Sequence, residues 1–244
     1  MNDIQLLFFI VGACLGSFGN VLIARLPKGM SLSGRSHCPQ CKKTICAYDL
    51  IPLVSYIFLQ GRCRSCKKSI SLQYPVVELA SGVLALLALA HTQTILTAVV
   101  LAISLWLLLL ITVIDAHTRG IHDALSFPFI VSGIVYGSLT TGIEPLALVI
   151  GVGFFGVQWL VSGGKWVGSG DVILMIGISA LLGYWEHVVL MIFIAYLSGA
   201  FVASALLLSK RKTRRDHLAF GPFLALGTFV ALFYSERILA FVLM

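Results

Sequence analysis

The chain has 244 residues, of which 59% are hydrophobic and 11% are charged, and its mean hydropathy is +0.99. Soluble domains carry about 25% charged residues, so this composition excludes a water-soluble protein and indicates a membrane protein. The net charge of +7 comes without any basic stripe interleaved with aromatic residues, which argues against nucleic-acid binding.

Eight apolar segments, taken in chain order, are candidates for membrane-spanning helices, since a spanning helix needs roughly 20 residues. The segments cover residues 4–24, 74–90, 94–114, 124–143, 145–164, 172–185, 188–209 and 218–235. Two of them, 74–90 and 172–185, are marginal in length or charge. The first is expected to be a retained anchor, because Asp3 precedes it where a signal peptide has basic residues. The sequence therefore predicts an all-α polytopic membrane protein of about eight transmembrane helices.

Lys and Arg residues predict the orientation of these helices. Nine of the 17 lie within residues 25–68, and five more lie in the run KRKTRR at 210–215. Cytoplasmic loops are enriched in Lys and Arg, so we expect the N-terminus outside and both clusters at the cytoplasmic side of the inner membrane. There they would attract anionic membrane lipid. The expected organisation is a first helix at 1–25, a cytoplasmic cysteine domain at 26–73 and a membrane bundle at 74–244, without an internal repeat.

The cysteine domain carries two C-x2-C pairs, Cys38 with Cys41 and Cys63 with Cys66. Four thiolates in two such pairs are typical of tetrahedral Zn²⁺ in a zinc-ribbon-like fold, although the 21 intervening residues exceed the usual spacing slightly. The alternatives are free thiols or two disulfides, and disulfides are disfavoured in the reducing cytoplasm. Cys46 and Cys14 lie outside the pattern. We expect this zinc to be structural and to shape a cytoplasmic platform.

Two carboxylates stand at the edges of predicted spans. Asp115 ends the third span, and Asp171 opens the sixth behind Gly168, Ser169 and Gly170. In the expected orientation both lie at the cytoplasmic edge, and a charge near hydrocarbon indicates a functional site. Two nearby carboxylates can divide into one acid and one base, which suits the activation of water against an amide. We therefore expect Asp115 and Asp171 to be catalytic.

Other interpretations stay open at this point. A single aspartate at a membrane edge can simply be solvated, and paired carboxylates also serve proton-coupled transporters. A zinc-containing membrane scaffold of a secretion apparatus is a further alternative. His117 and His122 flank Asp115 and could touch substrate, but solvation is the more common role of such loop histidines. Asp123 is expected to cap the fourth helix. Glu78 is either a buried functional acid or a first-turn partner of the helix dipole.

Four motifs in this order resemble the type IV prepilin peptidase family. They are GSFGNVLIARLP at 16–27, the cysteine domain almost throughout, GSGD at 168–171 and FGPFLALG at 220–227. The third matches the Gly-x-Gly-Asp signature that this family shares with presenilin-like membrane aspartyl proteases. Two residues after Asp171 the family commonly has Lys, and this chain has Ile173.

The resemblance implies that Asp115 and Asp171 are the two catalytic aspartates. It implies cleavage of a short basic leader from prepilin-like proteins, in type IV pilus and type II secretion systems. It further implies, as in many members, methylation of the new N-terminus with S-adenosylmethionine, attributed to the cysteine domain. The expected protein is thus a prepilin peptidase that is also an N-methyltransferase.

Overall fold

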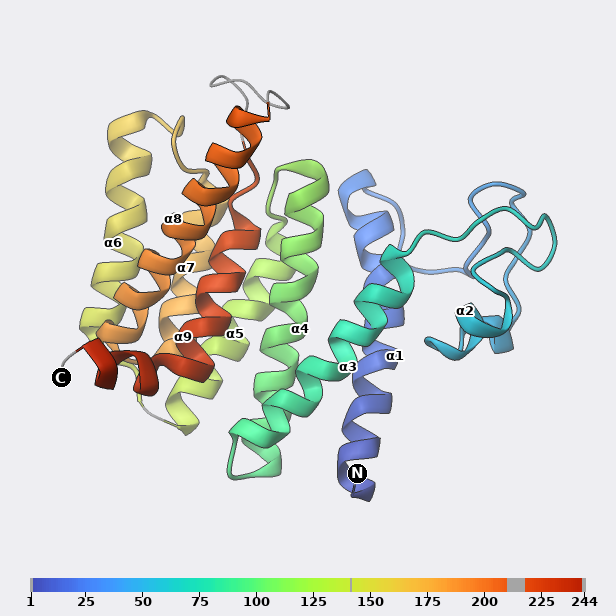
Figure 1. The fold of residues 1–244 in the computed structure, drawn as a ribbon, viewed down its shortest axis with the longest axis horizontal. Helices are drawn as coiled ribbons and strands as arrows, with labels where there is room; N and C mark the ends of the chain where they lie inside the picture. The colour runs from blue at the N-terminus through green and yellow to red at the C-terminus, as the bar shows by residue number, and fades with distance from the viewer. Residues whose placement is uncertain (1, 141, 210–217, 243–244) are drawn as a thin grey trace. The chain divides into compact units, whose positions relative to one another are not determined.

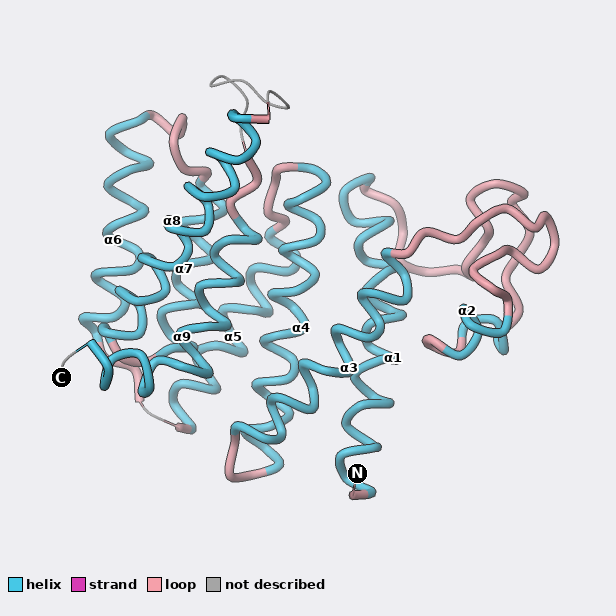
Figure 2. The backbone as a smooth tube through the Cα atoms, viewed as in Figure 1, coloured by secondary structure: helices cyan, strands magenta, loops and turns pink. Residues whose placement is uncertain are grey.

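The computed structural model describes residues 2–140, 142–209 and 218–242, and nearly all of them outside the cysteine domain are helical (Figures 1 and 2). The long helices are α1 (Asp3–Arg25), α3 (Gln73–His91), α4 (Ile95–Thr118), α5 (Asp123–Leu139), α6 (Pro145–Ser162), α7 (Ser169–Leu182), α8 (Trp185–Leu208) and α9 (Gly221–Val242). The cysteine domain adds the short elements η1 (Leu26–Lys28), η2 (Ala47–Leu50) and α2 (Val54–Phe58). The basic run at 210–215 lies outside the described residues.

Each of the eight predicted apolar segments is a helix, which confirms an all-α membrane protein. In the described part of the chain, six helices are long and apolar enough to cross a membrane, and α5 and α7 are shorter. The 14 residues of α7 span about 21 Å at 1.5 Å per residue, less than a hydrocarbon layer of about 30 Å. The predicted number of eight spans is therefore not confirmed.

Two helix ends differ from the prediction in a way that matters for the aspartates. α4 continues to Thr118, and α7 begins at Ser169, so both Asp115 and Asp171 are inside terminal helical turns. A charged residue ends an apolar run in the sequence, but it does not end a helix, because terminal turns tolerate polar side chains. Hydropathy alone consequently places these helix ends several residues too early or too late.

The chain forms two compact units, Met1–Leu110 and Ile111–Met244. In the first unit α1 packs closely along α3. A Cβ atom added to Gly16 would lie 2.7 Å from Cα of Glu78, so only glycine permits this approach. The indole N–H of Trp106 donates a hydrogen bond of 3.1 Å to the carbonyl of Leu15, which ties the first part of α4 to α1.

In the second unit α7 is the most enclosed helix and packs against both α5 and α6. Leu174, Met175 and Ile178 have no exposed surface. The backbone of α7 touches α5 at Gly133 and Gly137, where an added Cβ would meet carbonyl oxygens of α7. By contrast, α6 and α8 carry many exposed large apolar side chains on their outer faces, as expected for lipid-facing helices.

The close contact between α5 and α7 predicts opposite effects for two Gly→Ala substitutions. Gly137→Ala would place its methyl group on the carbonyl oxygen of Ala180, whereas Gly153→Ala on α6 has no heavy atom within 4 Å. We expect Gly137→Ala to lower the free energy of unfolding by about 1–3 kcal/mol. Gly153→Ala should be neutral or stabilising by up to about 1 kcal/mol, because Ala favours helix over Gly. Thermal unfolding of both purified variants in detergent measures this, and equal melting temperatures would contradict the contact.

Candidate functional site

The four cysteines of the two C-x2-C pairs come together in the cysteine domain. The Sγ atoms of Cys38, Cys41, Cys63 and Cys66 all lie within 4.8 Å of one another. The Sγ atoms of Cys38 and Cys66 are 3.9 Å apart. A Zn²⁺ ion with Zn–S bonds of about 2.3 Å requires sulfur atoms about 3.8 Å apart at the corners of its tetrahedron. The cluster therefore suits a zinc ion, and the described cysteines form no disulfide.

Both cysteine turns have the same backbone geometry. In the first, the N–H of Cys38 donates to the carbonyl of Lys43 at 2.9 Å, and in the second the N–H of Cys63 donates to the carbonyl of Lys68 at 2.8 Å. Lys42 and Lys67 occupy the matching left-handed position, each with φ of 60°. Residues 37–44 and 62–69 are thus a short structural repeat with the shared letters C-x2-C-K-K, which the prediction of no internal repeat overlooked.

Backbone N–H groups favour thiolates in this cluster. Those of Cys66 and Ser65 lower the pKa of Cys63 to about 6, and that of Cys41 contributes most to lowering the pKa of Cys38. At Cys66 the backbone N–H of Lys68 also acts to lower the pKa. Burial and the neighbouring thiols outweigh it and raise that pKa to about 11. Four thiolates at this spacing therefore need a cation between them.

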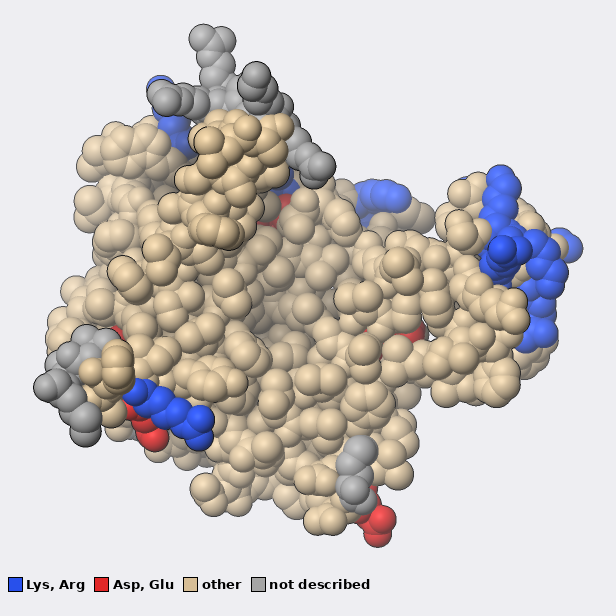
Figure 3. Space-filling view, in the orientation of Figure 1, with Lys and Arg blue, Asp and Glu red and all other residues tan. Residues whose placement is uncertain are grey.

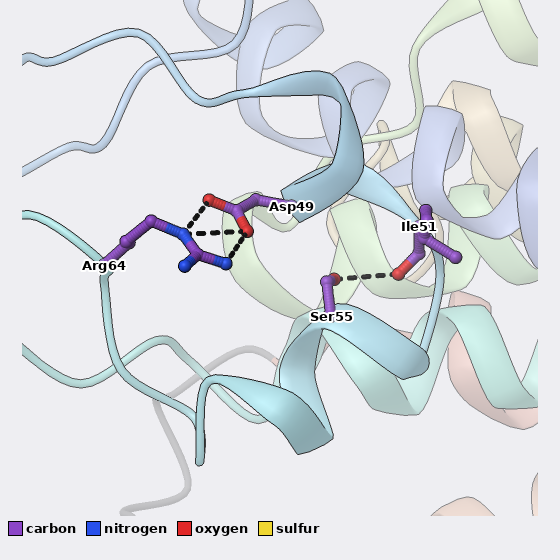
Figure 4. A network of polar contacts seen from close by, with 4 residues as sticks. All are labelled: Asp49, Ile51, Ser55 and Arg64. Atoms are coloured by element: carbon purple, nitrogen blue, oxygen red, sulfur yellow. Dashed lines mark hydrogen bonds and ion pairs between the residues drawn. The ribbon is translucent and has the colours of Figure 1, made fainter.

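An ion pair joins η2 to the second cysteine turn (Figure 4). The guanidinium of Arg64 binds Asp49 through both carboxylate oxygens, with Nη2 to Oδ1 at 2.7 Å and Nε to Oδ2 at 2.9 Å. The hydrogen bonds from Arg64 hold the pKa of Asp49 below its usual value. Arg64 also lies over the ring of Tyr48 at 5.1 Å. This two-point contact stabilises the path of the chain between the cysteine pairs.

Asp115 lies in the last turn of α4 and is buried, with 5% of its surface exposed. The backbone N–H of Gly221, the first residue of α9, donates a 2.8 Å hydrogen bond to its Oδ2 atom. A Cβ on Gly221 would lie 2.8 Å from that same oxygen, so the contact requires glycine. Gly221 belongs to the motif FGPFLALG at 220–227, and nothing in the sequence near that motif connects it to Asp115.

Asp171 is the third residue of α7 and is 9% exposed. Its Oδ2 atom accepts a 3.0 Å hydrogen bond from the N–H of Gly168, the N-cap residue of the helix. Gly170 lets this turn pack against Ile121, whose Cβ atom would lie 2.9 Å from an added methyl group. The glycines of GSGD thus serve the local packing and the hydrogen bonding of Asp171.

The structure brings Asp115 and Asp171 together, and we call them the aspartate pair. They are close enough for their charges to interact. Among the described residues neither is in an ion pair with Lys or Arg, and Lys165 near Asp171 is exposed. A carboxylate at this helix position commonly caps the helix and faces water. A buried one beside a second carboxylate costs stability, which indicates a function other than capping.

An aromatic cluster that was not predicted from the sequence lies next to Gly221, the residue that binds Asp115. The ring of Phe220, which precedes Gly221, lies 5.2 Å from that of Tyr196 and 6.0 Å from that of Phe155. The hydroxyl of Tyr196 donates a 2.8 Å hydrogen bond to Oε1 of Gln158, and Tyr196 lies close enough to Asp171 to feel the charge of its carboxylate. The only sequence signal was a polar Gln158 within an otherwise apolar span.

The other polar residues that the sequence singled out near the spans lie in exposed, capping or separately hydrogen-bonded positions. His117 is exposed, and His122 is the N-cap of α5, so Asp123 is the first helical residue and not the expected cap. Glu78 is buried in the second turn of α3, which excludes the first-turn role, and its Oε2 atom accepts a 2.8 Å hydrogen bond from the N–H of Leu53. Ile173 occupies the second turn of α7.

Comparison with known proteins assigns the family. Residues 10–92 match the bacterial peptidase A24 N-terminal domain, and residues 102–204 match the type IV leader peptidase family. A prepilin leader peptidase/N-methyltransferase of Aeromonas hydrophila is 30% identical over 95% of this chain and 91% of its own length. The chain belongs to the type IV leader peptidase family.

Further relatives carry the same name. That of Burkholderia pseudomallei is 33% identical over 96% of this chain and 87% of its own length. That of Klebsiella pneumoniae is 36% identical over 72% of this chain and 84% of its own length. No solved structure matches the chain. Family membership and the apolar helices together establish a multi-pass membrane peptidase.

The cysteine geometry predicts about one Zn²⁺ per chain. Cys63→Ser should abolish stoichiometric zinc in purified protein, because three remaining sulfur ligands no longer close the tetrahedron. Cys46→Ser and Cys14→Ser should retain it, since neither side chain belongs to the cluster. Elemental analysis of the three variants and the parent protein checks this. A parent protein without zinc, or zinc loss in the Cys46 variant, would contradict the proposed ligand set.

Proposed function

We propose that the chain is an aspartic endopeptidase that removes the leader peptide of prepilin-like proteins at the cytoplasmic face of the inner membrane. One observation carries the proposal. Two buried carboxylates, Asp115 from α4 and Asp171 from α7, lie within electrostatic reach of each other at helix ends. The relatives named prepilin leader peptidase/N-methyltransferase supply the substrate class.

In this proposal the two aspartates have different roles in amide hydrolysis. One carboxylate accepts a proton from water, while the other carboxyl group donates its proton to the carbonyl oxygen of the scissile peptide. Oδ2 of each aspartate is occupied by a backbone N–H, from Gly221 and Gly168 respectively. The Oδ1 atoms have no partner among the described residues and are available to water and substrate. Proton return to the leaving nitrogen then completes cleavage.

The predicted orientation of the helices in the membrane places the aspartate pair on the side where the leader of a prepilin-like substrate would be. With the N-terminus outside, the Lys- and Arg-rich cysteine domain at 26–73 is cytoplasmic, as is the end of α4 that carries Asp115. A prepilin-like substrate that spans the same membrane would then present the cytoplasmic end of its helix to the aspartate pair. The basic residues of the cysteine domain would meet anionic lipid.

Methylation of the new N-terminus is the second proposed activity. The relatives are named N-methyltransferases, and S-adenosylmethionine is the methyl donor that we propose. The described residues contain two isolated β-bridges but no strand, so a strand–glycine-turn–helix cradle for the adenosyl group is absent from them. We place this activity in the cysteine domain without assigning residues to the donor, and the zinc ion has a structural role there. Proteolysis is placed in residues 74–244.

The two alternatives from the sequence have less support. A carboxylate-coupled transporter would hold its acids near the middle of the membrane, whereas Asp115 and Asp171 are in terminal helical turns. A purely structural zinc scaffold leaves the burial of both aspartates without a reason. Membership of a peptidase family favours the enzyme over both.

Substitution of either aspartate tests the proposed peptidase. Asp115→Asn and Asp171→Asn should each lower the rate of prepilin cleavage by at least about a thousandfold, because one acid and one base are both needed. The double variant should be no slower than either single variant. Mass analysis of a co-reconstituted prepilin gives the rates.

The matched control for this test is Asp123→Asn, which removes an exposed carboxylate at the start of α5. It should cleave at the parent rate. A single Asp115 or Asp171 variant that cleaves at near the parent rate, while correctly inserted in the membrane, would refute the assignment.

Separate sites for the two activities predict separable losses. Asp171→Asn should still methylate a pilin that already has a free N-terminus when S-adenosylmethionine is added. Cys63→Ser combined with Cys66→Ser should lose methylation before it loses cleavage. Mass analysis of both substrates measures both products. Failure of Asp171→Asn on pre-cleaved pilin, where the parent succeeds, would show that the two activities share one site.

A further inference from the structure

The cysteine domain exposes an apolar stripe that neither the zinc cluster nor the aspartate pair uses. It consists of Leu50, Ile51, Val54, Ile57 and Phe58, which are 41%, 48%, 45%, 72% and 83% exposed. Val54, Ile57 and Phe58 are three and four residues apart and therefore share one face of α2, while Leu50 and Ile51 lie at the end of η2 just before it. Aliphatic and aromatic side chains gathered in this way on a surface mark an interaction site.

The stripe is held against the spanning helices by a buried carboxylate. The N–H of Leu53 donates to Oε2 of Glu78 at 2.8 Å, and Glu78 is 8% exposed within α3. Leu53 itself has φ of 62° and ψ of −48°, a conformation that is unfavourable for a branched side chain. A residue keeps such a conformation when its surroundings determine it, so this hydrogen bond fixes where the stripe lies.

The segment that precedes α2 also lies beside α1. A cavity of about 260 Å³ separates the two and is lined by Cys14, Ser17, Phe18 and Val21 of α1 together with Ser36, Leu50 and Pro52 of the cysteine domain. The uncharged run of α1 ends at Arg25, whose Nη1 atom donates to the carbonyls of Ser31, Leu32 and Ser33 at 3.0–3.1 Å. We infer that the lipid headgroups lie at this level, because basic residues flank the cytoplasmic ends of spanning helices.

The depth of the stripe follows from helix geometry. Cys14 and Val21 precede Arg25 by 11 and four residues, so they lie about 16 and 6 Å further along the helix at 1.5 Å per residue. Glu78 lies five residues into α3, about 8 Å from its start. Interfacial amphipathic helices lie about 5–10 Å into the boundary between headgroups and acyl chains. Leu53, whose N–H binds Glu78, therefore lies about 8 Å from the start of α3, within the depth range at which apolar side chains meet acyl chains.

Charge identifies the lipid. Residues 26–73 contain eight Lys and Arg but a single acidic residue, Asp49, whose charge is already neutralised by Arg64. In Figure 3 the Lys and Arg side chains gather on the cysteine domain, while the surface over α2 is largely free of them. Ser55 of α2 turns its hydroxyl back onto the carbonyl of Ile51 at 2.7 Å, so it does not interrupt the apolar face (Figure 4).

We propose that the apolar stripe inserts into the membrane leaflet beside α1 and α3 and that anionic phospholipid is its occupant. The acyl chains cover the stripe, and the surrounding Lys and Arg side chains bind the lipid phosphates. The zinc cluster is thereby held at the membrane surface and cannot move freely in the cytoplasm. This inference rests on α1 and α3 crossing the membrane and is independent of the catalytic roles of Asp115 and Asp171.

The test is photo-crosslinking of the full chain in nanodiscs. A benzophenone amino acid replaces Phe58 in one variant and Thr44, an exposed residue of the first cysteine turn, in the matched control. In discs with phosphatidylglycerol and phosphatidylcholine, we expect lipid adducts at position 58 to exceed those at position 44 by about tenfold. Intact-protein mass analysis counts the adducts, and unchanged zinc content shows that both variants are folded.

The same experiment separates lipid from the other occupants. Adducts at position 58 to a second copy of the chain or to an added prepilin, or equal lipid yields at positions 58 and 44, would overturn the proposal.

Lys43→Gln and Lys68→Gln should each reduce the preference for phosphatidylglycerol over phosphatidylcholine by about fivefold. An unchanged preference in the double variant would refute the anionic lipid as the occupant. None of these readouts uses prepilin cleavage, so they stand or fall separately from the peptidase assignment.

Discussion

A carboxylate at the edge of a hydrocarbon layer is costly unless hydrogen bonds replace its water, and this constraint organises the molecule. In both compact units a backbone N–H is a hydrogen-bond donor to a buried carboxylate. Gly221 binds Asp115 across 106 positions of sequence, and Leu53 binds Glu78 across 25. A backbone donor adds no charge, so it does not neutralise a carboxylate as an Arg or Lys partner would. For the aspartate pair this matters, because a neutralised carboxylate is a poor general base.

The helices and the zinc ligands were predictable because their signals are local and periodic. Long uncharged runs predict spanning helices from the thickness of the membrane, and two C-x2-C pairs predict the zinc ligands from tetrahedral geometry. The matched positions of Asp115 and Asp171 followed from the positive-inside rule and from the order of spans. Each signal lies within a short stretch of sequence, and a general rule of membrane topology or metal geometry relates the stretches to one another. That is why the two aspartates could be paired before the structure placed them within electrostatic reach of each other.

What the sequence did not predict depends on contacts between distant segments. The N–H of Gly221 has no side-chain signature, and Tyr196 becomes informative only when Gln158 and Phe220 are seen beside it. The short helix α2 was missed because residues 26–73 were judged by their overall charge. Five apolar residues within a basic segment change little in its average composition, although all five are exposed on the surface of the fold. The number of spans is likewise not a matter of hydropathy alone, since α7 is buried by protein and is free to be short.

The glycines next to the two aspartates allow close helix packing and also supply hydrogen-bond donors to the carboxylates. Gly170 admits Ile121, and Gly221 admits the Asp115 carboxylate, so each glycine is required by a neighbour that a methyl group would displace. Gly168 instead contributes its N–H to Asp171. A motif such as Gly-x-Gly-Asp is therefore explained without any contact between its glycines and a substrate. The chemistry needs two carboxylates in an apolar bundle, and the glycines are what allow helix ends to approach closely enough to supply backbone donors to them.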